Sequence, residues 1–109
     1  MAATILRAAL AVAVAAAGGP AAANDIDVGR AKAVACAVCH GPLGISVQPD
    51  APHLAGQPAF YLATQLRAFR SGVRKHEVMA VIAKPLSDDD IANLAAWFSA
   101  IRIEASPPR

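Results

Sequence analysis

The five residues Cys36-Ala37-Val38-Cys39-His40 constrain the fold of this chain more than any other feature. Haem of the c type is attached to proteins through the pattern C-x-x-C-H. Two cysteines three positions apart can form thioethers with the two vinyl groups of one haem, and the imidazole of His40 is then placed to bind the iron from one side. The pattern predicts a domain built around one covalent haem, and leaves the ligand on the other side of the iron to be found.

The first 23 residues have the features of a secretory signal peptide. Arg7 forms a short positive region, residues 8–17 an apolar run, residues 18–20 a helix break, and Ala21-Ala22-Ala23 a small-residue cleavage site. An uncleaved membrane anchor is the alternative, but a span needs about 20 consecutive apolar residues and this run is shorter. We therefore expect residues 1–23 to be removed and residues 24–109 to form one exported, periplasmic domain.

The expected mature domain is small and nearly neutral. It has 109 − 23 = 86 residues, enough for a thin core. Domains of this size generally need a disulfide, a metal or a cofactor for stability. The two cysteines lie too close in sequence to close a useful disulfide loop, so we expect a buried haem to stabilise this domain. Without Arg7, nine Lys and Arg stand against eight Asp and Glu, a net charge of +1. That balance argues against general nucleic-acid binding.

The sequence is helical in pattern, without strand-like alternation or an internal repeat, and the predicted fold class is all-α. A first helix is expected from Asp25 or Asp27 into the C-x-x-C-H segment, and a second from Pro58 to Gly72. Between them, residues 41–56 are rich in Gly and Pro. Such a long irregular stretch is expected to wrap around something in a small domain.

The last helix has the strongest sequence signals. Ser87 is a good N-cap, and Asp90 three residues later can complete a capping box. The buried face is predicted to contain Ile91, Leu94, Ala95, Phe98 and Ile101. Trp97 lies beside that face, and Gly29 in the first helix lacks the side chain that would keep another helix away from it.

Two other chemistries use a C-x-x-C pair. A thiol–disulfide oxidoreductase does so in exported proteins, but the chain lacks the βαβ pattern expected beside that motif. A zinc module is the other alternative, and its remaining ligands would have to come from widely scattered histidines. Haem explains Cys36, Cys39 and His40 together.

The chain resembles the short bacterial class I cytochromes c, including the single-haem halves of dihaem members. The resemblance covers nearly all of residues 24–109 and lies in Gly29, CAVCHG at 36–41, PHLAGQPAFYLATQLRAFRSGVR at 52–74, Met79, and LSDDDIANLAAWFSA at 86–100. It implies a cytochrome c domain of three to five helices around one haem, in which the first and last helices cross with Gly29 against the region of Trp97.

The resemblance places Met79 as the second axial ligand of the iron. Apart from Met1, it is the only methionine in the chain, and it lies in the short segment 78–83, where a side chain can be aimed inward. His and Met ligation is known for electron-transfer cytochromes c. His76, three residues earlier, is the competing ligand. The alternative for Met79 itself is a flexible core residue.

The resemblance also implies a role for the backbone at Pro52, whose carbonyl region is expected to accept the other ring N–H of His40 and so orient it. His53 is interpreted as a surface or haem-edge residue rather than a ligand. With His40 and Met79 bound, the iron has no open position, so the predicted function is one-electron transfer and not catalysis. Both a thioether ligand and burial favour a moderately high potential.

Three arginines of the second helix, which we call the basic stretch, form a candidate surface for binding a redox partner. Arg67, Arg70 and Arg74 share one helical face, which is either a solvated edge or a surface that binds a haem propionate and steers an acidic redox partner. A free carrier is the preferred interpretation. The alternative is a haem c subunit dedicated to a dehydrogenase or flavoprotein, which should expose an apolar patch.

Overall fold

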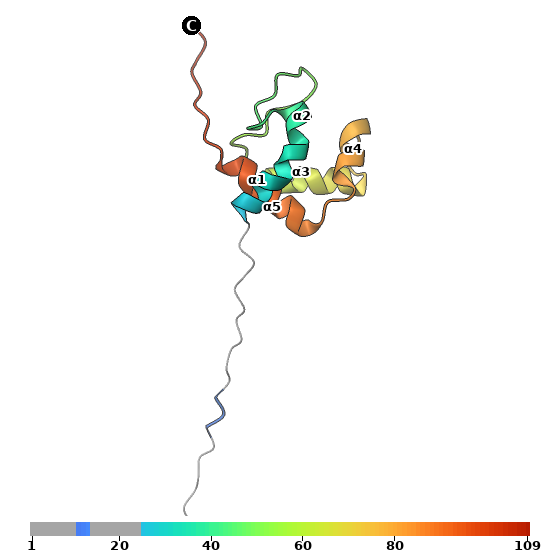
Figure 1. The fold of residues 1–109 in the computed structure, drawn as a ribbon, viewed down its shortest axis with the longest axis vertical. Coiled ribbons are helices and arrows are strands. Elements are labelled where there is room, and N and C mark those ends of the chain that lie inside the picture. Colours follow the sequence, from blue (N-terminus) through green and yellow to red (C-terminus); the bar gives the residue numbers. More distant parts are fainter. Residues whose placement is uncertain (1–10, 14–24) are drawn as a thin grey trace, which may run out of the picture.

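The computed structural model describes residues 11–13 and 25–109, so that most of the predicted signal peptide lies outside the described residues. The described part forms five α-helices and one 3₁₀ helix, and no strand occurs in it (Figure 1). The prediction of an all-α fold with three to five helices is therefore confirmed. Within these ranges no helix is long and apolar enough to cross a bilayer.

The first helix begins where the sequence predicted. Helix α1 (Ile26–Ala33) is capped by Asp25, whose side chain accepts hydrogen bonds from the backbone N–H groups of Asp27 and Val28. The chain then tightens into the 3₁₀ helix η1 (Val34–Cys36) and continues as α2 (Ala37–His40). The C-x-x-C-H segment thus begins at the last residue of η1 and ends α2, rather than lying in one uninterrupted α-helix.

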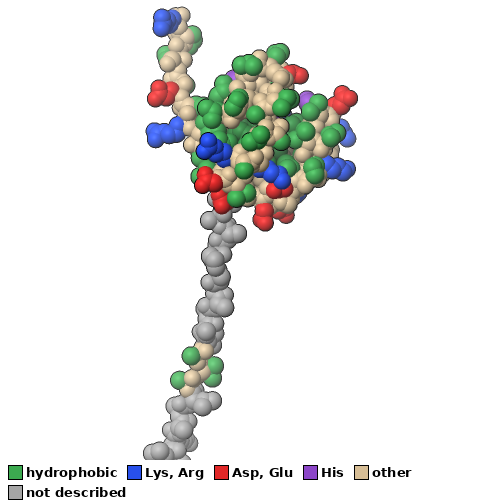
Figure 2. Space-filling model, viewed as in Figure 1, with side chains coloured by type: hydrophobic (Ala, Val, Ile, Leu, Met, Phe, Trp, Pro, Cys, Tyr) green, Lys and Arg blue, Asp and Glu red, His purple; other side chains and the backbone are tan. Residues whose placement is uncertain are grey.

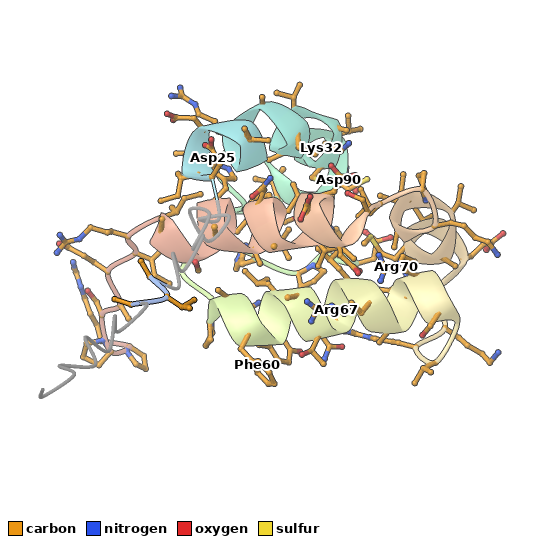
Figure 3. The ribbon with its side chains drawn as sticks, turned by 90° about the horizontal axis from the view of Figure 1, so that it is seen from below. Asp25, Lys32, Phe60, Arg67, Arg70 and Asp90 are labelled. Atoms are coloured by element: carbon orange, nitrogen blue, oxygen red, sulfur yellow. The ribbon has the colours of Figure 1, made fainter. Side chains whose placement is uncertain are left out.

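Helix α5 (Asp88–Ala100) lies between α1 and α3 (Ala59–Ser71) (Figure 3). At the α1–α5 crossing, a Cβ on Gly29 would lie 2.6 Å from the carbonyl carbon of Asn93 and 3.0 Å from Cβ of Trp97. Only glycine allows the two backbones this close. The predicted crossing of the first and last helices is thus present, and Lys32 reinforces it with an ion pair to Asp90 at 3.1 Å.

The core lies where α1, α3 and α5 meet. Its buried residues are Ala33, Leu62, Ala63, Ile91, Leu94, Ala95 and Phe98. Four of the five predicted apolar positions of α5 belong to it; Ile101 follows the end of the helix and is half-buried. Pro58 is the N-cap of α3 rather than its first helical residue, and Gly72 ends α3 with φ of +83°.

The capping box at the start of α5 is complete. Ser87 Oγ accepts from the Asp90 backbone N–H at 3.0 Å, and the Asp90 carboxylate accepts from the Ser87 N–H at 3.0 Å. Three aspartates in the first turn also face the positive end of the helix dipole. Hydrogen bonds from Ser87 and Lys32 hold the pKa of Asp90 below its usual value.

Helix α4 (Glu77–Ala83) was expected only as a short segment that presents Met79. Its N-cap is His76, whose Nδ1 accepts from the backbone N–H of Met79 at 3.2 Å. Only Ala83 of this helix is buried, although six of its seven residues are apolar. In Figure 1, α2 and α4 extend from the same side of α3.

Candidate haem site

The end of η1 and the whole of α2 present the three residues of the motif. Cys36 and Cys39 are both half-buried, and His40 is buried with 8% of its surface exposed. Burial raises the pKa of the Cys36 thiol, because it disfavours the charged thiolate. The two cysteines and His40 come from one short helical stretch, which places the three side chains close together in sequence and space.

The orientation of His40 is fixed by a hydrogen bond from outside its helix. Nδ1 of His40 lies 2.8 Å from the carbonyl oxygen of Pro52. A carbonyl oxygen only accepts, so Nδ1 must carry the proton and donate it. In the neutral ring Nε2 is then unprotonated, and its lone pair is available for a metal ion.

The loop of residues 41–56 holds Pro52 in place through Gly44. The Gly44 carbonyl accepts from the N–H groups of Leu54 at 2.7 Å and Ala55 at 3.1 Å. Gly44 has φ of +71°, and a Cβ there would lie 2.8 Å from the Phe98 ring. Because Phe98 belongs to the core of α5, the loop is packed against the core beside the motif.

A second set of contacts joins the same loop to α2. Ser46 Oγ donates to the carbonyl of Cys39 at 2.9 Å, and Gln48 Nε2 donates to the carbonyl of Val38 at 3.0 Å. These carbonyls lie in the last turn of α2, where they have no partner inside the helix. The backbone N–H of Ser46 donates to Nδ1 of His53 at 2.8 Å. Sequence reasoning missed Ser46 and Gln48; the available signal was two polar residues closely following the motif in a Gly- and Pro-rich loop.

Met79 is half-buried on α4, and the larger apolar side chains of that helix remain exposed. Val78, Val81 and Ile82 are 51%, 71% and 43% exposed. A seven-residue helix this apolar is marginal in water without a surface to cover it. The motif cysteines, an imidazole with a free Nε2 and an uncovered apolar helix bearing a thioether are the features that a covalently bound haem requires, so the residues fit the group.

The three arginines of the basic stretch differ in what they contact. Arg70 donates to the Leu86 carbonyl at 2.9 Å and forms an ion pair with Asp88 at 2.6 Å, which lowers the pKa of that carboxyl group. Arg74 donates to Gln65 and lies over the ring of Phe69 at 4.6 Å. Arg67 is exposed on α3, and no salt bridge is found for it among residues 25–109 (Figure 3).

A small helical domain with a C-x-x-C-H helix and an oriented imidazole defines the class of proteins that carry covalent haem. Residues 26–101 match the family model "Cytochrome c". The chain is 41% identical over 80 residues to cytochrome c-554(548) of Halomonas halodenitrificans, an alignment that covers 71% of this chain and 96% of the relative. The chain belongs to the cytochrome c family: its cofactor is haem c, and it is an electron carrier.

Two further comparisons place the chain among larger relatives. It is 45% identical over 67 residues to the "Thiosulfate dehydrogenase electron acceptor" of Stutzerimonas stutzeri, covering 59% of this chain and 31% of the relative. The crystal structure of reduced cytochrome c4 from Pseudomonas stutzeri matches with a TM-score of 0.69 at 37% identity, covering 73% of this chain and 47% of that one. The chain therefore spans less than half the length of these two proteins.

Proposed function

We propose that the haem is attached through Cys36 and Cys39, that His40 and Met79 are the axial ligands of its iron, and that the protein is a periplasmic one-electron carrier. The observation that carries this proposal is the 2.8 Å hydrogen bond between His40 Nδ1 and the Pro52 carbonyl. It leaves Nε2 as the lone-pair donor and increases the basicity of the ring, as such partners do for metal-bound histidines.

The position of Met79 supports it as the second ligand. Its backbone N–H is held by the N-cap of α4, which fixes where the side chain begins. His76, the competing ligand, supplies that cap through Nδ1. If His76 moved to the iron, α4 would lose its N-cap, a change that costs about 1 kcal/mol in other helices. Met79 can bind without that loss.

The two ligands determine what this protein can do. Haem supplies one-electron oxidation and reduction of iron, at a potential set by the axial ligands and by burial. An imidazole and a thioether together leave no coordination position for a substrate. A thioether ligand would favour the reduced state, and burial of the haem beside His40, which is 8% exposed, would do the same. We therefore propose a carrier with a moderately high reduction potential and without catalytic activity of its own.

The surface is suited to brief contact with another protein. Val38 and Val47 are 80% and 96% exposed. Figure 2 shows hydrophobic side chains spread over the visible face of the domain, with charged side chains among them and at the periphery. A small contact area with both apolar and charged side chains is typical of transient electron-transfer complexes, whereas a dedicated subunit should expose a larger continuous apolar patch. Of the basic stretch, we assign the steering of an acidic partner to Arg67, because Arg70 and Arg74 are engaged within the domain.

The relatives favour different answers to whether the redox partner is permanent. Similarity over 96% of cytochrome c-554(548), whose name gives no enzyme partner, favours a free carrier. Similarity to a protein named as the electron acceptor of thiosulfate dehydrogenase favours the second candidate, a haem c subunit dedicated to a dehydrogenase. The proposal also includes export, supported by the signal pattern of residues 1–23. The mass of the purified protein tests cleavage before Asn24.

The ligand assignment is tested with a Met79→Ala variant, produced in a host that matures c-type cytochromes. Alanine removes the thioether and opens one coordination position, so the ferrous variant should bind carbon monoxide and its absorption spectrum should change. His76→Ala is the matched control, three residues away on the same segment, and should keep the wild-type spectrum and bind no carbon monoxide.

The outcomes separate the alternatives. If Met79→Ala has the wild-type spectrum and does not bind carbon monoxide, Met79 is not the ligand. If instead His76→Ala opens the site, ligation is by two histidines and the midpoint potential should be strongly negative. A wild-type protein without a pyridine haemochrome signal would exclude haem attachment at Cys36 and Cys39.

A further inference from the structure

The hydrogen bonds around the motif form a closed network that links two pairs of residues, each pair consecutive in sequence. Cys39 and His40 are consecutive, and so are Pro52 and His53. His40 Nδ1 donates directly to the Pro52 carbonyl at 2.8 Å. Ser46 connects the other two members, because its Oγ donates to the Cys39 carbonyl at 2.9 Å and its N–H donates to His53 Nδ1 at 2.8 Å.

Ser46 is the most firmly held residue of this hydrogen-bond network. It is buried, with 8% of its surface exposed, and its Oγ also accepts from the Gln48 N–H at 3.0 Å. His53 is exposed and is held at its backbone as well, since its carbonyl accepts from Gln57 Nε2 at 2.6 Å. A backbone N–H only donates, so His53 Nδ1 must be the unprotonated nitrogen of its ring.

We propose that His53 is a positioning residue for the iron ligand His40. This inference rests on the proposed function, because it takes His40 as the ligand whose orientation matters. By accepting from Ser46, the His53 side chain anchors its own backbone, and the carbonyl of Pro52 belongs to the peptide unit that joins Pro52 to His53. Loss of the Ser46–His53 bond therefore weakens the constraint that aims this carbonyl at His40.

The effect on the haem follows from the chemistry of the ligand. An imidazole that donates a well-aligned hydrogen bond is a more basic ligand and stabilises the oxidised metal. A looser Pro52–His40 bond makes His40 a weaker donor, so the reduction potential should rise. Asn is the matched replacement for His53, because its Oδ1 is bonded to Cγ as Nδ1 is in histidine and can accept from Ser46.

The experiment compares holoprotein of the wild type with the His53→Ala and His53→Asn variants. Two quantities are measured at one pH: the midpoint potential and the hydrogen-exchange rate of the Ser46 amide by NMR. His53→Ala should raise the potential and speed exchange at Ser46 about tenfold, the effect of losing one hydrogen bond. His53→Asn should return both quantities toward wild type. Absorption spectra and carbon monoxide binding should be the same in all three proteins.

Two results overturn the inference. If His53→Ala matches the wild type in potential and in exchange at Ser46, His53 has no positioning role. If both variants shift the potential equally, the acceptor atom is not the cause. Neither result affects the assignment of His40 and Met79, which fails separately if the wild-type protein carries no haem or binds carbon monoxide in the ferrous state.

Discussion

Replacing Gly29 with alanine is the most direct test of how α1 and α5 pack. The added Cβ would lie 2.6 Å from the Asn93 carbonyl carbon, whereas carbon atoms in favourable contact are about 3.5 Å apart or more. The shortfall is at least about 3.5 − 2.6 = 0.9 Å, since the Asn93 carbonyl oxygen would lie closer still. Because the obstacle is backbone in the interior of α5, it cannot rotate away, and the helices must separate by a similar distance.

The expected loss of stability follows from two opposing effects. Overpacking of a tight site costs about 1 to 3 kcal/mol, and a clash with backbone belongs at the upper end. Alanine in place of glycine recovers about 1 kcal/mol of helix propensity. The net expectation for Gly29→Ala is a loss of about 2 kcal/mol, or roughly 10 °C in Tm for a domain of this size. Urea unfolding of the holoprotein, followed by far-UV circular dichroism, measures it.

Gly72→Ala is the matched control for this measurement. A Cβ on Gly72 would have no atom within 4 Å, but the residue has φ of +83°. Alanine there should cost only the strain of a left-handed residue, about 1 kcal/mol. A Gly29→Ala protein at least as stable as wild type would show that α1 and α5 are not in close contact at this point, and the reasoning from the Cβ distances would be wrong.

Two further predictions concern charge. Asp90→Asn should lower stability at about pH 7 by less than about 1 kcal/mol, and stability should then fall less steeply in acid. Ser87 and Lys32 lower the pKa of Asp90 in the folded protein. The stabilisation by Asp90 is therefore present above the unfolded pKa of about 3.9 and is lost as pH falls through the folded pKa. Urea midpoints at several pH values measure this, and parallel profiles for the two proteins would contradict it. Arg67→Gln should slow association with an acidic redox partner and make the association rate less dependent on ionic strength, while the stability of the protein stays unchanged. Stopped-flow association rates of the wild type that do not respond to salt would rule out steering.

The helices and the core were predictable because their signals are local. Ser87 and Asp90 lie three residues apart, and the buried residues of α5 recur at the period of one helix. Such signals depend on neighbours in sequence, which a single chain shows directly. Gly29 was also predictable, since a glycine inside a helix facing an indole indicates close approach. Met79 could be singled out because it is the only methionine besides Met1.

The contacts of the loop were not predictable in the same way. Ser46 bonds to residues seven positions away on both sides, and nothing in the residue type of His53 says that its ring accepts a backbone proton. These bonds depend on the path of the loop, which is set by positive φ at Gly41 and Gly44 and by packing on Phe98. Sequence periodicity contains no information about such a path. Helix α4 was missed for a related reason, because its N-cap is a histidine.

Helix α5 connects the packing of the domain to the orientation of His40, the proposed iron ligand. On one side Asn93 and Trp97 meet Gly29 of α1, the helix that leads into the motif. On another, Phe98 meets Gly44, whose carbonyl holds the segment that follows Pro52. The C-x-x-C-H segment and the Pro52 carbonyl that accepts from His40 are therefore both positioned by the same helix. A substitution that moves α5 shifts both of these parts together. A change at the exposed His53 acts through Ser46 and the Pro52 carbonyl and leaves α5 in place, so the His53 variants report on the orientation of His40 rather than on the fold.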